Sequence, residues 1–154
     1  MRKDFAVACY RDGDGWTVNA INHRTIAGVS RALGQLRSTG PAFGIVCEDD
    51  VVFALVRRSP RGLRVFLSDA AVDTALVDEA VDLLDEDLDY ILGEDTEDDS
   101  AAPAGDWGVL EDLGLSEQLL GVLVDNDELW ATDQVLTIAQ EVGCDAELER
   151  AVGR

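Results

Sequence analysis

AFGIVCEDDVVFALVRRSPRGLRVFLS, residues 42–68, carries the clearest structural pattern in the chain. Two apolar runs rich in β-forming side chains, residues 42–48 and 51–58, are joined tightly by EDD. The turn sequence SPRG follows, in which proline pre-sets the backbone of the second position, and residues 63–68 form a third run. Three consecutive strands with tight connections predict an antiparallel meander.

Strand and helix patterns also precede and follow this meander. Residues 5–10 and 16–21 predict two short strands around the glycine-rich turn DGDG. Apolar residues at helical spacing predict one helix from the N-cap Thr25 to about Ser38, and another over residues 71–85. The expected fold is therefore α+β, an antiparallel sheet of about five strands in the order ββαβββα, with the helices packed on one face of the sheet.

The rest of the chain divides into a linker and a helical region. Residues 93–106 lose all periodicity and combine high charge, small residues and proline, which is typical of a flexible acidic linker. Four helical segments are expected after it, the first over residues 107–113 and the others beginning at Ser116, near Thr132 and after Asp145. We therefore expect an α+β sheet domain over residues 1–92 and a C-terminal helical region over residues 107–154.

Charge is distributed unevenly along the chain. Thirty-two acidic and twelve basic residues give a formal net charge of −20 at pH 7. Residues 1–68 carry a net charge of +4, and residues 69–154 carry −24. Such a chain repels nucleic acid and anionic membranes, so neither direct nucleic-acid binding nor membrane association is expected. Adaptation to high salt would spread acids over the whole surface, so a functional or solubilising acidic half explains the asymmetry better.

The N-terminal sequence and the cysteines carry no targeting, disulfide or zinc signal. The apolar run before Arg11 is too short for the core of a signal peptide, and no stretch approaches the length of a membrane span. Cys9, Cys47 and Cys144 are an odd number of widely spaced thiols. We therefore expect a cytoplasmic protein without a disulfide framework.

The sequence contains no recognisable motif for catalysis, cofactor binding or metal binding. His23, the only histidine, lies between a predicted strand and a predicted helix, which favours an exposed loop residue over a catalytic one. Residues 85–89, DEDLD, resemble the start of a calcium-binding loop, but such a loop needs glycine and glutamate where Tyr90 and Thr96 stand. No catalytic residue, cofactor or metal is therefore expected.

The second predicted helix carries a row of carboxylates. Asp78, Asp82, Asp85 and Asp89 recur at i, i+4, i+7 and i+11, and no lysine or arginine in this helix relieves their repulsion. A solvated helix face explains such a row. The functional hypothesis is a docking stripe for a basic partner, because charge steers encounters between proteins.

The tryptophans are candidates for either an interface or the core. Tryptophan is enriched at binding hot spots. Trp107 and Trp130 flank the predicted C-terminal helices, however, so packing of these helices together explains them more simply. We expect them in the core.

Several segments taken together resemble a known family. They are DFAVA at residues 4–8, FGIV at 43–46 ahead of DD, LSDA at 67–70 and LEDLGLS at 110–116, with the acidic stretch between the two halves. In this combination, and over nearly its whole length, the chain is similar to the actinobacterial family of tRNA adenosine deaminase-associated proteins. The family name implies genes that lie beside that of the deaminase, and its motifs bring no catalytic residues. The deaminase itself needs His-x-Glu and Pro-Cys-x-x-Cys to hold zinc, whereas Arg24 and Thr25 follow His23 here.

The sequence therefore predicts a non-enzymatic accessory or adaptor protein that docks a basic partner through an acidic surface. The resemblance implies that this partner is the tRNA adenosine deaminase or another tRNA-handling protein. Two alternatives stay open: a small-molecule-binding or sensory α+β domain, and an acidic nucleic-acid mimic that inhibits a tRNA-binding protein.

Overall fold

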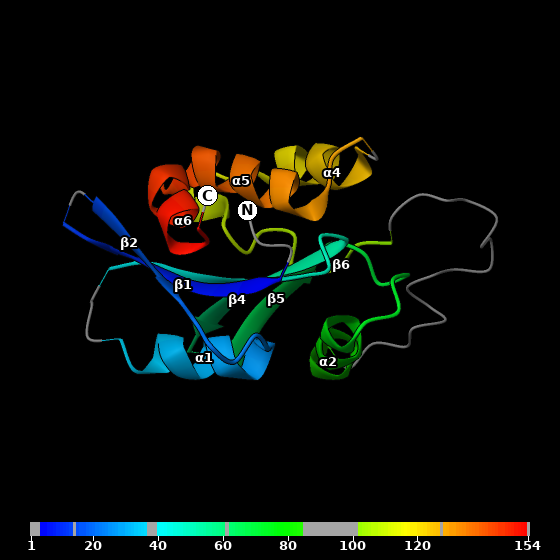
Figure 1. The fold of residues 1–154 in the computed structure, drawn as a ribbon, viewed down its shortest axis with the longest axis horizontal. Helices are drawn as coiled ribbons and strands as arrows, with labels where there is room; N and C mark the ends of the chain where they lie inside the picture. Colours follow the sequence, from blue (N-terminus) through cyan, green and yellow to red (C-terminus); the bar gives the residue numbers. More distant parts are fainter. Residues whose placement is uncertain are drawn as a thin grey trace.

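The computed structural model describes residues 4–13, 15–36, 40–60, 62–84, 102–126 and 128–153. Within these residues the chain forms one antiparallel sheet of six strands, in the order β2-β1-β3-β4-β5-β6 (Figure 1). The strands are β1 Phe5–Asp12, β2 Gly15–Ala20, β3 Ala42–Glu48, β4 Val52–Ser59, β5 Gly62–Leu67 and β6 Ala104–Gly105. The α+β class and the antiparallel β3-β4-β5 meander are confirmed.

Helices cover both faces of the sheet and give three layers (Figure 1). α1, Ile26–Gly34, and α2, Ala75–Leu84, lie on one face. α4, Glu117–Asp125, α5, Ala131–Val142, and α6, Asp145–Ala151, lie on the other. The two helices expected on one face are found there, and the C-terminal helices cover the opposite face.

Successive residues of the central strands belong to different halves of the core. Val46 of β3 and Ala54 of β4 pack toward α1 and α2, whereas their neighbours Ile45 and Leu55 pack toward the C-terminal helices. All four side chains are buried. Because side chains alternate between the faces of a strand, a sheet covered on both sides needs apolar residues at successive positions. This explains the continuous apolar runs in the β3 and β4 sequences.

Two of the helix starts expected from the sequence carry the expected side-chain caps. Thr25 Oγ1 accepts a hydrogen bond from the Gly28 N–H at 2.9 Å, and Ser116 Oγ accepts one from the Leu119 N–H at 3.1 Å. Each cap satisfies an N–H group that has no partner within its own helix.

Carboxylates from distant parts of the chain also cap helix N-termini, including that of α1. Glu79 of α2 accepts from the first two N–H groups of α1, at 2.7 and 3.0 Å. In the β3–β4 turn, Glu48 accepts from the Leu76 N–H of α2 at 2.9 Å, and Asp50 accepts from the Thr132 N–H of α5 at 2.8 Å. Negative charge at a helix N-terminus is stabilising. This turn therefore holds a helix on each side of the sheet.

Two arginines fasten the C-terminal part of the chain to the sheet. Arg57 of β4 and Arg64 of β5 are cross-strand partners. Their contacts are Arg57 with both carboxylate oxygens of Asp112 and the Val109 carbonyl, and Arg64 with the carboxylate of Asp106 and the Gly108 carbonyl. We call this set the arginine clamp. It joins the basic half of the sequence to the acidic half.

The segment from residue 102 to residue 113 differs most from expectation. The two-residue strand β6 lies at the end of the expected linker and pairs with Phe66 and Leu67. In place of the helix expected over residues 107–113, only the 3-10 turn Glu111–Leu113 forms. The clamp explains this, because the arginines hold backbone carbonyls that an α-helix would need for its own hydrogen bonds.

Candidate functional site

The carboxylates expected to form a docking stripe are only partly described. Asp78 and Asp82 lie on α2, four residues apart, and both are exposed. Asp85 and Asp89 lie outside the described residues. Within the described part of the chain, no three His, Cys, Asp or Glu side chains come together to hold a metal ion.

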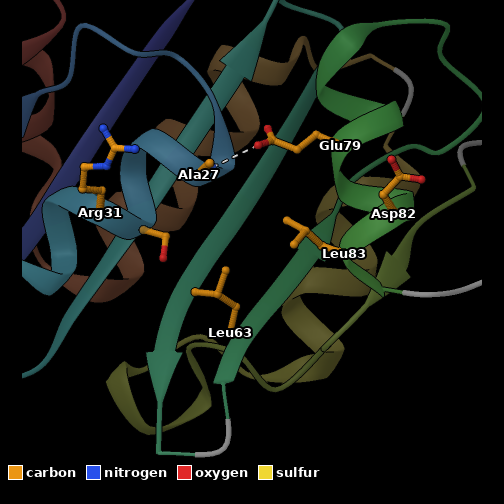
Figure 2. A pocket seen from close by; sticks show the side chains of 7 residues that line it. Ala27, Arg31, Leu63, Glu79, Asp82 and Leu83 are labelled. Carbon is orange, nitrogen blue, oxygen red and sulfur yellow. Dashed lines mark hydrogen bonds between the residues drawn. The ribbon is translucent and has the colours of Figure 1, made fainter.

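Asp82 also borders a pocket between α1, α2 and the sheet. The pocket has a volume of about 450 Å³, and its lining residues are Ala27, Ser30, Arg31, Leu63, Glu79, Asp82 and Leu83. Figure 2 shows Leu63 and Leu83 between the helices, with Arg31 on the α1 side and Asp82 on the α2 side. Leu63 is 37% exposed and Leu83 is 48% exposed. Local sequence patterns could not reveal this pocket, because its walls come from two helices that are distant in the chain.

The residues that line the pocket include a serine and two carboxylates but no histidine. Both oxygens of Glu79 already accept hydrogen bonds, one from the Ile26 N–H and one from the Ala27 N–H, so this carboxylate is held as a helix cap. Figure 2 draws the bond from Ala27. A nucleophile needs a base beside it, and no histidine lines the pocket next to Ser30. It offers an apolar floor with Arg31 and two carboxylates, Glu79 and Asp82, at its sides.

The buried cysteines are poor candidates for nucleophilic chemistry. A hydrogen bond with the Cys144 thiol and burial both raise the pKa of Cys9 well above its ordinary value. Burial, with the nearby charges of Asp50, Asp4 and Asp49, raises the pKa of Cys47 to about 12. A thiol reacts as its thiolate. Cys9 and Cys47 are therefore protonated, inert core residues at neutral pH.

The tryptophans occupy three different environments. Trp16 packs edge-on against Phe43, with ring centroids 5.6 Å apart, and Trp107 packs edge-on against Phe66 at 4.9 Å. Both are partly buried against the core on the α4–α6 face. Trp130 is 61% exposed, so the expectation that it belongs to the core is wrong. The reason is that it precedes the first residue of α5, outside the apolar face of that helix.

Fold and site together define a small acidic α+β protein with helices on both faces of its sheet and, among the described residues, no group of His, Cys, Asp or Glu side chains that could hold a metal ion. The profile of the family described as Rv3753c-like tRNA adenosine deaminase-associated protein matches residues 4–145. Protein Rv3753c of Mycobacterium tuberculosis (strain ATCC 25618 / H37Rv) is 37% identical over 155 residues, which covers 97% of this chain and 88% of the relative. The chain belongs to this family, as the sequence resemblance predicts.

Two further findings concern solved structures and membrane spans. No solved structure gives a significant match to the chain. Among the described helices, none has the length and apolar character required to cross a membrane.

Proposed function

We propose that this protein is a non-enzymatic accessory protein that docks a basic partner through its acidic surface, and that the partner is the tRNA adenosine deaminase. The family description supplies the association with that enzyme. An enzyme that handles tRNA needs a basic surface to meet phosphates, and such a surface attracts carboxylates as well.

One observation carries the proposal: the acids of the C-terminal half have almost no basic residues to neutralise them. No lysine or arginine occurs between Arg64 and Arg150. Arg57 and Arg64, the basic residues that do reach this half, are held in the arginine clamp by Asp112 and Asp106. Exposed carboxylates of this half, such as Asp78 and Asp82 of α2, therefore remain available to an external cation.

Asp78 and Asp82 are our candidates for the docking residues. They lie four residues apart on α2 and are exposed, and neither forms an ion pair with another described residue. Exposed charges attract a partner over roughly 10 Å at about 0.1 M salt and are screened at higher salt. Docking of this kind is fast and sensitive to ionic strength.

Calorimetric titration of the purified deaminase tests the proposal. The affinity should fall about tenfold or more between about 50 mM and about 500 mM NaCl. Asp78→Asn with Asp82→Asn should weaken binding at low salt, whereas Glu117→Gln with Glu141→Gln makes the same change in charge at other exposed positions and serves as the control. Absence of binding, or an affinity that does not change with salt concentration, contradicts the proposal.

A deamination assay separates an adaptor from a mimic. An increase in the deamination rate indicates an activating adaptor, and a decrease indicates a nucleic-acid mimic.

The pocket favours a second candidate function, a small-molecule-binding or sensory domain. Its volume and its mostly apolar lining are typical of ligand sites. A ligand that occupies it should raise the melting temperature of the wild type, because only the folded state binds. Ala27→Phe, which fills the pocket from the exposed side of α1, should remove that increase. If no compound in a metabolite panel raises the melting temperature, this candidate fails.

A further inference from the structure

Trp130, the residue before α5, and Val51, the residue before β4, both have exposed apolar side chains. Trp130 is 61% exposed and Val51 is 42% exposed. The Ala131 N–H donates to the Asp50 carbonyl at 3.1 Å, so the peptide unit joining Trp130 to Ala131 lies against the one joining Asp50 to Val51. The two apolar side chains therefore leave from adjacent backbone segments that are far apart in the sequence.

Carboxylates surround this apolar pair. Asp49 is exposed in the β3–β4 turn two residues before Val51, and Glu128 is exposed two residues before Trp130. We call Val51, Trp130, Asp49 and Glu128 the Trp130 patch. Neither of its two carboxylates has a cationic partner among the described residues. The negative charge of this corner is also felt inside the protein, since Asp50, Asp4 and Asp49 all act to raise the pKa of the buried Cys47 thiol.

The β3–β4 turn and the start of α5 hold the patch in a fixed shape. Asp50 Oδ1 accepts from the Thr132 N–H at 2.8 Å, and Asp133 Oδ2 accepts from the Trp130 N–H at 3.2 Å. Three residues connect β3 to β4, since Glu48 pairs with Val52, and the Val51 N–H donates to the Glu48 carbonyl at 3.1 Å. Asp49 and Asp50, the two residues inside this hydrogen-bonded turn, both have positive φ, at 54° and 59°. Because the backbone that carries these side chains is already fixed, it loses little conformational freedom when a partner binds.

We propose that the Trp130 patch is an anchor for a basic protein segment, with an arginine side chain seated on the Trp130 indole and paired with Asp49 or Glu128. A guanidinium is the group that meets both parts of the patch. It stacks on an indole face and forms two parallel hydrogen bonds with a carboxylate. Phosphate groups of a nucleic acid or an anionic lipid would be repelled, and so would the same acidic patch on a second copy of this chain.

This inference rests on the proposed function, because it names where the basic partner is gripped. The Trp130 patch lies on the α4–α6 side of the molecule, whereas Asp78 and Asp82 lie on the opposite side of the sheet. A competing occupant is the chain's own N-terminus. Arg2 and Lys3 immediately precede Asp4, whose carboxylate accepts the Asp49 N–H at 2.6 Å.

Indole N–H resonances test the proposal directly. The three tryptophans give three indole signals, which single Trp→Phe variants assign. The probes are the purified deaminase and a synthetic peptide of alternating arginine and leucine, with a glutamate–leucine peptide as the control. The Trp130 signal should shift with the deaminase and with the basic peptide but not with the acidic peptide, while the signals of Trp16 and Trp107 should stay in place.

Affinity measurements separate this inference from the proposed function. Trp130→Ser should weaken binding of the basic peptide and of the deaminase about tenfold, as expected for a hot-spot residue. Asp49→Asn with Glu128→Gln should weaken it and reduce its salt dependence, and Glu117→Gln with Glu141→Gln, which makes the same change in charge at other exposed positions, serves as the control. Unchanged melting temperatures show that the variants are folded.

Each remaining outcome decides one of the two proposals. If Trp130→Ser binds the deaminase as tightly as the wild type, the anchor is wrong and the docking function stands. If the deaminase does not bind at all, the docking function fails, and a shift of the Trp130 signal by the basic peptide alone still supports the anchor. If neither probe moves this signal, the anchor is wrong. If Arg2→Ser with Lys3→Ser moves it without any added partner, the occupant is the N-terminus and the proposal is overturned.

Discussion

Asp50 shows how single acidic residues build this fold. It lies in the β3–β4 turn with φ at 59°, a backbone conformation that aspartate tolerates better than most side chains. Its carboxylate caps the N-terminus of α5, 82 residues further along the chain. The residue therefore serves the turn through its backbone and the C-terminal layer through its side chain.

Replacement of Asp50 by alanine should destabilise the protein more than replacement of Asp49 by alanine. Both residues have positive φ, so both variants strain the turn, but Asp50→Ala also removes the cap of α5. The expected difference in the free energy of unfolding is about 1 kcal/mol. Urea unfolding measures it, and Asp50→Asn, which keeps an acceptor oxygen, should recover part of the loss. Equal destabilisation by the two alanine variants would show that the cap contributes nothing.

Gly44 is required by close packing rather than by backbone conformation. A Cβ at this position would lie 2.0 Å from Cγ1 of Val29, where α1 crosses β3. Gly44→Ala should therefore reduce the free energy of unfolding by about 1–3 kcal/mol, the usual range for overpacking. Gly15→Ala is the control, because no atom lies within 4 Å of a Cβ there. A shift of the urea midpoint that is no larger for Gly44→Ala than for Gly15→Ala would contradict this account.

At the level of whole elements, the arginine clamp decides where the C-terminal part of the chain begins to pack. The chain crosses from the α1–α2 face to the α4–α6 face through β6, and Gly105 makes the turn at φ 105°. A Cβ on Gly105 would lie 2.2 Å from the Val65 carbonyl oxygen. The clamp then holds residues 106–112 over the sheet, and Trp107 packs on Phe66 beneath it.

Stability should depend on pH through the two clamp aspartates. Hydrogen bonds from Arg64 and from Arg57 lower the pKa values of Asp106 and Asp112 below the ordinary 3.8. A group whose pKa is lowered in the folded state stabilises the protein above its unfolded pKa, and this stabilisation is lost as the pH falls through the folded pKa. The stabilisation is thus complete at neutral pH, begins to fall near the unfolded pKa of about 4, and is lost as the pH drops below the folded pKa values.

A double variant, Asp106→Asn with Asp112→Asn, isolates this contribution. Its urea midpoint should be lower than that of the wild type at pH 7, and the difference should shrink as the pH is lowered from about 5 to about 2. Asp78→Asn with Asp82→Asn makes the same change in charge on exposed side chains and controls for the general effect of net charge. A difference that stays constant with pH would mean that the aspartates act through packing alone.

For the whole molecule, one sheet serves two cores. The face that carries Phe43, Ile45, Phe53 and Leu55 is buried under the C-terminal helices, and the opposite face is buried under α1 and α2. Without residues 107–154, the first face would be an exposed apolar surface, which a soluble monomer rarely tolerates. We therefore propose that residues 1–92 and residues 107–154 differ in sequence character but fold together as one unit.

Both parts should unfold in a single transition. Urea curves followed by tryptophan fluorescence, which reports Trp16 and Trp107 between the layers, should coincide with curves followed by far-ultraviolet circular dichroism. Leu120→Ala under the C-terminal helices and Val29→Ala under α1 should each lower the same midpoint. Two separate transitions, with Leu120→Ala affecting only one of them, would show that the helical region is an independent domain.

Local patterns let the sequence determine most of the elements. The meander matches expectation to within one residue at each end, because alternating and apolar runs with turn residues are properties of neighbouring positions. Thr25 and Ser116 start helices, and Gly114 and Gly143 end their segments in the left-handed conformation, for the same reason. The family membership also followed from sequence alone.

What the sequence could not give depends on contacts between distant residues. β6 has no pattern of its own and exists because its backbone pairs with Phe66 and Leu67. The exposure of Trp130, its place beside Val51 and the pocket between α1 and α2 arise from how whole elements are stacked. The sequence by itself determined strands β1 to β5, the starts of α1 and α4 and the charge of the two halves. The tertiary structure decided which carboxylates cap helices or pair with arginines, and which remain exposed, because long-range packing selects the neighbours of each side chain.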